Sequence, residues 1–77
     1  MIRELETVVL THDIKAHGLE QGDVGAVVHV HGEGGAFEVE FVTAEGTTVA
    51  LLTLEADEIR PMAHREILHA RELTTTP

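Results

Sequence analysis

GDVGAVVHVHGEGGAFEVEFVTAEGTTVALLTL, residues 22–54, decides the fold of this chain. It contains three runs rich in apolar residues, over 24–31, 36–43 and 48–54, separated by two turns that contain glycine. In the first two runs, apolar residues alternate with other residues, which is typical of strands that bury one face. The stretch therefore predicts a three-stranded antiparallel meander around which the rest of the chain closes.

The register of the first hairpin follows from its turn, GEGG at residues 32–35. If these four residues form the loop, the flanking strands can be paired residue by residue. Three apolar pairs then meet on the core face: Val30 with Phe37, Val28 with Val39, and Ala26 with Phe41. Two pairs meet on the outer face: His29 with Glu38, and Val27 with Glu40. Turn length and hydrophobic pattern agree, so we expect this register in the folded chain.

The register of the second hairpin stays open between two alternatives. A two-residue turn at Glu45 and Gly46 divides the last run between the two faces, with Ala50, Leu52 and Leu54 inside and Val49 and Leu51 outside. A three-residue turn with Gly46 in the left-handed region would exchange the two sets. In both cases one apolar stripe of this strand faces away from the main core.

The flanking segments complete an all-β chain. They read in turn as a β-branched strand, a long loop pinned to the core by two apolar side chains, one helical turn, and a short strand that ends at a proline. In chain order these are residues 6–11, 11–20 (pinned by Ile14 and Leu19), 55–58 and 59–61. Five short strands with these connections predict a small five-stranded SH3-like barrel over residues 1–62.

The tail, residues 63–77, follows this domain. Its segment HREILHAREL, residues 64–73, could form a short helix with Ile67, Leu68, Ala70 and Leu73 on the apolar side. So short a helix is marginal unless it packs on something. Residues 74–77 predict a disordered end.

The composition restricts the classes of function. The 77 residues allow one domain, and the absence of cysteine excludes disulfides, thiolate metal sites and a cysteine nucleophile. The net charge is −9, and the five basic residues are scattered: Arg3, Lys15, Arg60, Arg65 and Arg71. This pattern argues against nucleic acid and anionic membranes and favours a basic protein partner. Without a signal-peptide pattern or ~20 consecutive apolar residues, we expect a soluble cytoplasmic protein.

Two histidine groups could bind a metal or a ligand. His29 and His31 share one strand face with Glu38 opposite, and two imidazoles with a carboxylate could ligate zinc or nickel. An exposed histidine–glutamate pair across two strands explains the same pattern without a metal. His12, Asp13 and His17 form a second cluster in the first loop, which we interpret as solvated loop residues.

An enzyme is not expected. The only hydroxyl side chains are threonines, and the acidic residues of the central strands lie on outward faces where they are ionised and solvated. A core this small is also poorly suited to enclosing a water-excluding pocket of roughly 300 Å³ or more. We therefore expect no catalytic residue and no cofactor.

Two stretches resemble known families. The turn Gly22-Asp23-Val24-Gly25-Ala26-Val27-Val28 resembles the glycine–x–x–glycine–x–valine turn of KOW-type SH3-like barrels. KOW-type modules usually carry basic residues near this turn, whereas this chain has Glu20 and Asp23, so their role in binding RNA does not carry over.

Residues 5–61 are similar to an uncharacterised bacterial family of small domains of unknown function. The similar positions are Leu5 to Leu10, Gly18-Leu19, Gly22 to Gly25, Phe37 to Phe41, Ala56-Asp57 and Arg60-Pro61. This resemblance implies an SH3-like barrel and no reaction, and it implies genomic neighbours that are small proteins of toxin-like or unknown type.

The outer sheet face is the predicted functional surface. Val27, Val42, Val49 and Leu51, with Glu40 among them, would form an exposed apolar patch unless the tail, a second copy of the chain or another protein covers it. We predict a non-enzymatic acidic protein-binding module, in one version an antitoxin- or immunity-like inhibitor of a basic partner. Its predicted contact residues are Glu38, Glu40, Val42, Val49, Leu51 and His29, with Glu33 and Glu45 adding charge. The alternative is a small metal- or ligand-binding protein that uses His29, His31 and Glu38.

Overall fold

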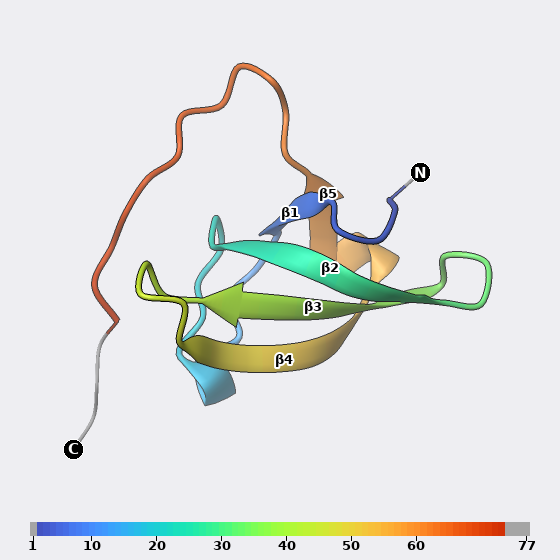
Figure 1. Cartoon of the computed structure of the whole chain (residues 1–77), viewed down its shortest axis with the longest axis horizontal. Coiled ribbons are helices and arrows are strands. Elements are labelled where there is room, and N and C mark those ends of the chain that lie inside the picture. The colour runs from blue at the N-terminus through green and yellow to red at the C-terminus, as the bar shows by residue number, and fades with distance from the viewer. Residues whose placement is uncertain (1, 74–77) are drawn as a thin grey trace.

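The computed structural model describes residues 2–73 and shows one antiparallel sheet of five strands in the order β4-β3-β2-β1-β5 (Figure 1). The strands are β1 (Thr7–Leu10), β2 (Val24–His31), β3 (Ala36–Val42), β4 (Thr48–Glu55) and β5 (Ile59–Pro61). Two 3-10 helices, η1 (Lys15–His17) and η2 (Ala56–Glu58), lie in the first loop and before the last strand. The all-β class, the central meander and the helical turn before the last strand are therefore confirmed.

The sheet is not closed into a barrel, so this part of the SH3-like prediction is wrong. β4 and β5 are the two edge strands, and β5 pairs only with β1. β5 has three residues and ends at Pro61, which has no N–H to donate. So short a strand, reached directly from β4 through η2, cannot complete a second ladder.

The tail contains no helix within the described residues, so the short helix that was considered possible over 64–73 is not formed. Ile67 and Leu68, two residues of its supposed apolar side, are 94% and 69% exposed. A helix of this length without a packing partner does not offset the cost of nucleation. The disordered end expected over 74–77 lies outside the described residues.

A β-bulge in β2 changes the predicted first hairpin. The pairs His29–Glu38 and Val30–Phe37 are found as predicted, but the register shifts between Val27 and His29, so Val27 lies opposite Val39. Because one extra residue moves all preceding side chains to the other face, Val27 is fully buried and Val28 is 40% exposed. The predicted positions of Val27 outside and Val28 inside are thus wrong.

The second hairpin follows the first of the two alternatives. Phe37 lies opposite Leu54, Val39 opposite Leu52, and Phe41 opposite Ala50. The register shifts between Phe41 and Val42, near the turn, and Val49 packs against the core instead of pointing away from it. Only Leu51 of the predicted outer pair of this strand is exposed.

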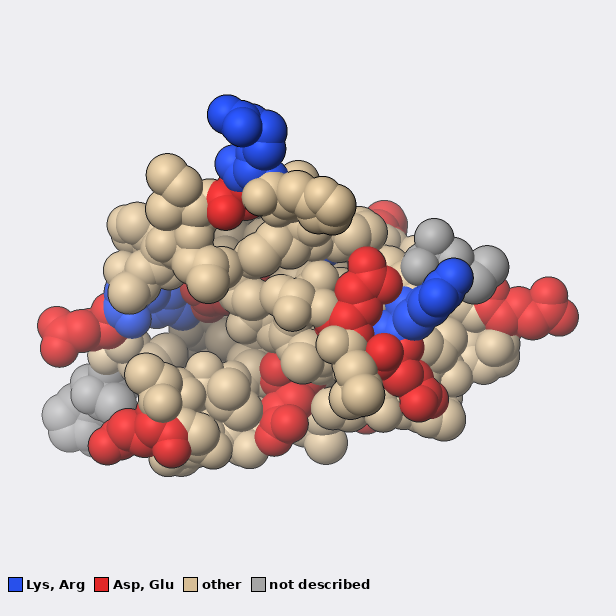
Figure 2. Space-filling model, turned by 45° about the horizontal axis from the view of Figure 1, so that its top comes forward, with Lys and Arg blue, Asp and Glu red and all other residues tan. Residues whose placement is uncertain are grey.

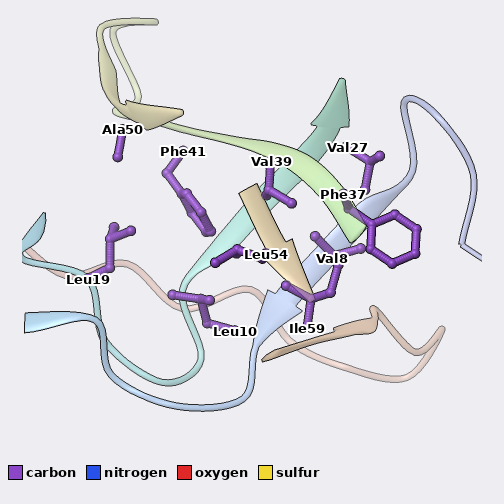
Figure 3. Packing of buried hydrophobic residues seen from close by; sticks show 10 residues of the cluster. All are labelled: Val8, Leu10, Leu19, Val27, Phe37, Val39, Phe41, Ala50, Leu54 and Ile59. Carbon is purple, nitrogen blue, oxygen red and sulfur yellow. The ribbon is translucent and has the colours of Figure 1, made fainter. Parts of the chain in front are cut away.

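The core lies on one face of the curved sheet and is closed by the first loop (Figure 3). Fully burying one aliphatic side chain contributes about 1.5–3 kcal/mol, so the buried apolar side chains of this core are the main source of the domain's stability. Leu19 joins the core from the loop and Ile14 packs beside it, as predicted. The buried cluster contains Val8, Leu10, Leu19, Val27, Phe37, Val39, Phe41, Ala50, Leu54 and Ile59.

Candidate functional site

Glu38 is the centre of a polar cluster on the outer face of β3. Its Oε2 atom accepts a hydrogen bond of 2.6 Å from the hydroxyl of Thr53 and lies 2.8 Å from Nε2 of His31. The hydrogen bonds from Thr53 and then from His31 lower the pKa of Glu38. Since these donors favour the ionised form, Glu38 presents a fixed negative charge on the sheet.

Glu40 and Leu51 lie side by side on the same face. The two residues are paired between β3 and β4, and Glu40 Oε2 accepts a hydrogen bond of 2.7 Å from the Thr48 hydroxyl. Leu51 is 55% exposed. The predicted juxtaposition of a carboxylate and an exposed apolar side chain is therefore present at this position.

The predicted metal-binding trio is only partly assembled. His31 contacts Glu38, but Nδ1 of His29 lies 3.6 Å from a carboxylate oxygen of Glu4. The rings of His29 and His31 meet edge to face with centroids 4.7 Å apart. Within residues 2–73, no group of three or more His, Cys, Asp or Glu side chains is placed to hold a metal ion. Metal binding here stays a prediction, and a rise of Tm on addition of zinc would test it.

The first-loop histidines do not form a cluster. His12 lies 3.1 Å from Glu58, whereas the carboxylate of Asp13 accepts the backbone N–H of Gln21 at 2.8 Å. His17 lies in η1. The carboxylate and imidazole side chains of the first loop therefore make separate contacts and do not form one site.

A cleft of about 680 Å³ separates the tail from one end of the sheet. In Figure 1 the tail leaves β5 and runs around the body to the side where the β3–β4 turn lies. We call this space the tail cleft; its domain wall includes Leu19, Asp23, Val24, Phe41, Val42 and Val49, and its tail wall is residues 69–73. Two members of the predicted outer patch, Val42 and Val49, therefore line this cleft together with Leu73.

Arg71 anchors the tail at this cleft. Its Nε and Nη2 atoms donate to the two carboxylate oxygens of Asp23 at 2.9 and 2.5 Å, and Nη2 also donates to the Gly18 carbonyl at 2.9 Å. Such a bidentate pair is stronger and more directional than a single contact. Arg71 and Asp23 keep 23% and 18% of their side-chain surface exposed. The guanidinium thus donates three hydrogen bonds to the domain, two to Asp23 and one to Gly18.

The pKa of Asp23 is set by opposing effects. Partial burial acts to raise it, but the hydrogen bonds from Arg71 and from the backbone N–H of Glu20 outweigh burial and lower it below 3.8. At the start of the tail, the hydrogen bonds from Arg60 and from the Ala63 N–H lower the pKa of Glu66 to about 2.

We expect Asp23 to stabilise the docked tail at neutral pH and to lose this effect in acid. Because its folded pKa is depressed, the contribution is complete above pH 3.8 and is lost as the pH falls through the lower folded value. A carboxyl ¹³C titration by NMR should give an Asp23 midpoint below 3.8 that rises in Arg71→Ala. Arg65→Ala, in the same tail, is the control and should leave the midpoint unchanged. A midpoint that is insensitive to Arg71→Ala would contradict this assignment.

The pair Arg71–Asp23 was not predicted from the sequence. The two residues are far apart in the chain, and Asp23 was interpreted only as a turn residue. The one signal present in the sequence was the charge balance: with 14 acidic and five basic residues, any basic residue that is partly buried has many possible acidic partners. Which acidic residue each would meet depends on the path of the tail, which no periodic pattern encodes.

The fold and these surfaces can be compared with known proteins. A family model described as Domain of unknown function (DUF4926) matches residues 4–61. The chain belongs to this family. The match covers all five strands of the DUF4926 domain and ends before the tail.

No curated protein and no solved structure matches the chain. Among the helices of the described residues, none has the length and apolar character that crossing a membrane requires. The function of this DUF4926 domain must therefore be argued from its own surfaces.

Proposed function

We propose that this DUF4926 domain is a non-enzymatic acidic module that binds a basic protein partner in the cytoplasm. The observation that carries the proposal is the pairing of charge with exposed apolar surface on the outer sheet face. Glu38 and Glu40 lie there at alternate positions of β3, and Leu51 lies beside Glu40. An interface needs apolar area for affinity and complementary charge for orientation and speed of association.

The overall charge supports a basic partner. The net charge of −9 on 77 residues creates a negative field that attracts cationic surfaces and repels polyanions. Acidic side chains are spread over the face drawn in Figure 2, and basic ones are few. In one specific form of this proposal, the domain acts as an antitoxin- or immunity-like inhibitor that masks a basic site on its partner.

The fixed carboxylates suit recognition better than catalysis. Glu38 and Glu40 each accept a hydrogen bond from a threonine hydroxyl and lie on an open sheet face. A general acid or base works best with a pKa near the working pH, whereas the pKa of Glu38 is lowered. These properties favour a constant charge pattern over proton transfer.

Reversal of a single charge tests the proposed surface. We expect the wild-type domain to retain a stoichiometric partner from native lysate, and Glu40→Lys to bind that partner at least about tenfold more weakly, since lost attraction becomes repulsion. Asp57→Lys makes the same change of charge in η2, where the Asp57 carbonyl accepts a hydrogen bond from Thr11 at the start of the first loop, and should retain the partner. Binding should also weaken as salt increases.

Two results would count against the proposal. One is recovery of no stoichiometric partner by the wild-type domain. The other is equal binding by wild type and Glu40→Lys, which would place the interface elsewhere on the molecule.

A further inference from the structure

The two walls of the tail cleft differ in whether the DUF4926 match includes them. Its domain wall, including Leu19, Asp23, Val24 and Val42, lies within the segment that matches the DUF4926 family, whereas residues 69–73 lie outside the match. The cleft therefore lies between the matched domain, which supplies one wall, and an extended tail segment, which supplies the other.

The domain supplies the groups that bind the guanidinium of Arg71. The Asp23 carboxylate is held in place because it also accepts the N–H of Glu20 at 2.8 Å. Gly18, in the left-handed conformation at φ 69°, ends η1, and its carbonyl accepts from Arg71. Two carboxylate oxygens that accept from two different nitrogens, with a carbonyl beside them, match the planar fork of arginine and not the single ammonium group of lysine. Glu20 adds a charge 3.7 Å from Arg71.

The tail is held at few points between its start and the cleft. Residues 67–70 are all exposed, and Ile67 and Leu68 make almost no use of their apolar surface. Arg71 enters the cleft region, and Leu73, which is only 37% exposed, lines it two residues later. A segment fixed mainly by one ion pair and one apolar side chain can be displaced by a competitor with the same two groups.

We propose that the tail cleft is a recognition site for an extended segment of a partner protein that carries an arginine followed two residues later by a leucine. In this chain the tail already occupies the arginine position of that site, with Arg71 bound to Asp23 and Gly18, and with Leu73 lining the cleft. The tail thereby restrains partner binding until it is displaced. This site is separate from the outer sheet face, so the inference stands even if Glu40 and Leu51 bind nothing.

Emptying the site in the full-length chain tests the inference. In Arg71→Ala the tail loses its anchor, and the synthetic peptide EILHAREL, which has the sequence of residues 66–73, serves as the probe. We expect the peptide to bind this variant with amide shifts at Gly18 and Asp23 in NMR spectra. Binding to the wild type should be at least about tenfold weaker, because the docked tail reduces the competent fraction to roughly one tenth.

Two controls address the chemistry. The same peptide with lysine in place of arginine should bind Arg71→Ala at least about tenfold more weakly, because the bidentate contact is lost. Asp23→Asn in the Arg71→Ala background should also abolish binding. The lysine peptide keeps the test decisive if this double variant does not fold.

Three outcomes would overturn the inference. They are no binding of EILHAREL to Arg71→Ala at millimolar peptide, equal binding to the wild type, and shifts that map away from Gly18 and Asp23. A wild-type dimer that forms with increasing concentration and is lost in Arg71→Ala would identify the occupant as the tail of a second copy, and would overturn the assignment to a partner protein.

Discussion

Val27→Asp is expected to unfold the domain, whereas Val28→Asp leaves it folded. Val27 is fully buried and faces Val39 across the first hairpin. The substitution removes the burial of a valine and leaves an unpaired charge in the core, a combined cost of about 5 kcal/mol or more. In a domain of fewer than about 80 residues the core rarely supplies a free energy of unfolding above about 3–5 kcal/mol, so the loss removes nearly all of it.

The neighbouring substitution is the matched control. Val28 lies in the bulge and is 40% exposed, so aspartate there keeps its hydration and costs about 1 kcal/mol or less. Urea unfolding followed by circular dichroism measures both variants. Strict alternation without a bulge predicts the reverse order, so a folded Val27→Asp and an unfolded Val28→Asp would refute the bulge.

Gly25→Ala is expected to lower the free energy of unfolding by about 3 kcal/mol, near the upper end for overpacking one buried position. A Cβ atom on Gly25 would lie 2.7 Å from Cγ1 of Val39, 2.8 Å from Cε1 of Phe41 and 3.0 Å from the carbonyl oxygen of Glu40. The last of these is backbone in a central strand, so it cannot move without disturbing the ladder. β2 and β3 can approach this closely only because residue 25 has no side chain.

Gly35→Ala supplies the control for this prediction. A Cβ at Gly35 would meet no atom within 4 Å, and its φ angle is not in the left-handed region. We expect its effect on the free energy of unfolding to stay within about 0.5 kcal/mol of zero. Thermal or urea unfolding of the two alanine variants gives the comparison, and equal destabilisation would contradict a steric role for Gly25.

The sequence predicted the strands well because their signals are local. The strand segments, the helical turn before β5, and the pinning of the first loop by Leu19 depend on alternation, β-branching and turn residues that lie close together in the chain. The pair Val30–Phe37 followed from turn length alone. The bulge was missed because Val27 and Val28 are both valine, so the hydrophobic pattern does not decide which one enters the core.

The candidate site was harder to predict because it depends on contacts between distant segments. Glu38 and Glu40 were placed on the outer face from alternation, and both lie there. Val42 and Val49 were assigned to an outer patch, whereas the register shift near the turn and the path of the tail bring them to the tail cleft. The path of the tail depends on the ion pair between Arg71 and Asp23. The turn motif around Asp23 gives no indication of that pair.

The short pairing of β5 with β1 sets an order of assembly. The two hairpins of the meander join neighbouring segments, whereas β1 and β5 are roughly 50 residues apart in the sequence and share three pairs. Contacts between distant segments have the larger entropy cost of loop closure, so we expect the meander to form first and β5 to dock last. The tail begins where β5 ends, so pairing of β5 with β1 brings the start of the tail to the sheet and shortens the loop that must close when Arg71 binds Asp23. We therefore expect the tail to dock after the domain beneath it has folded.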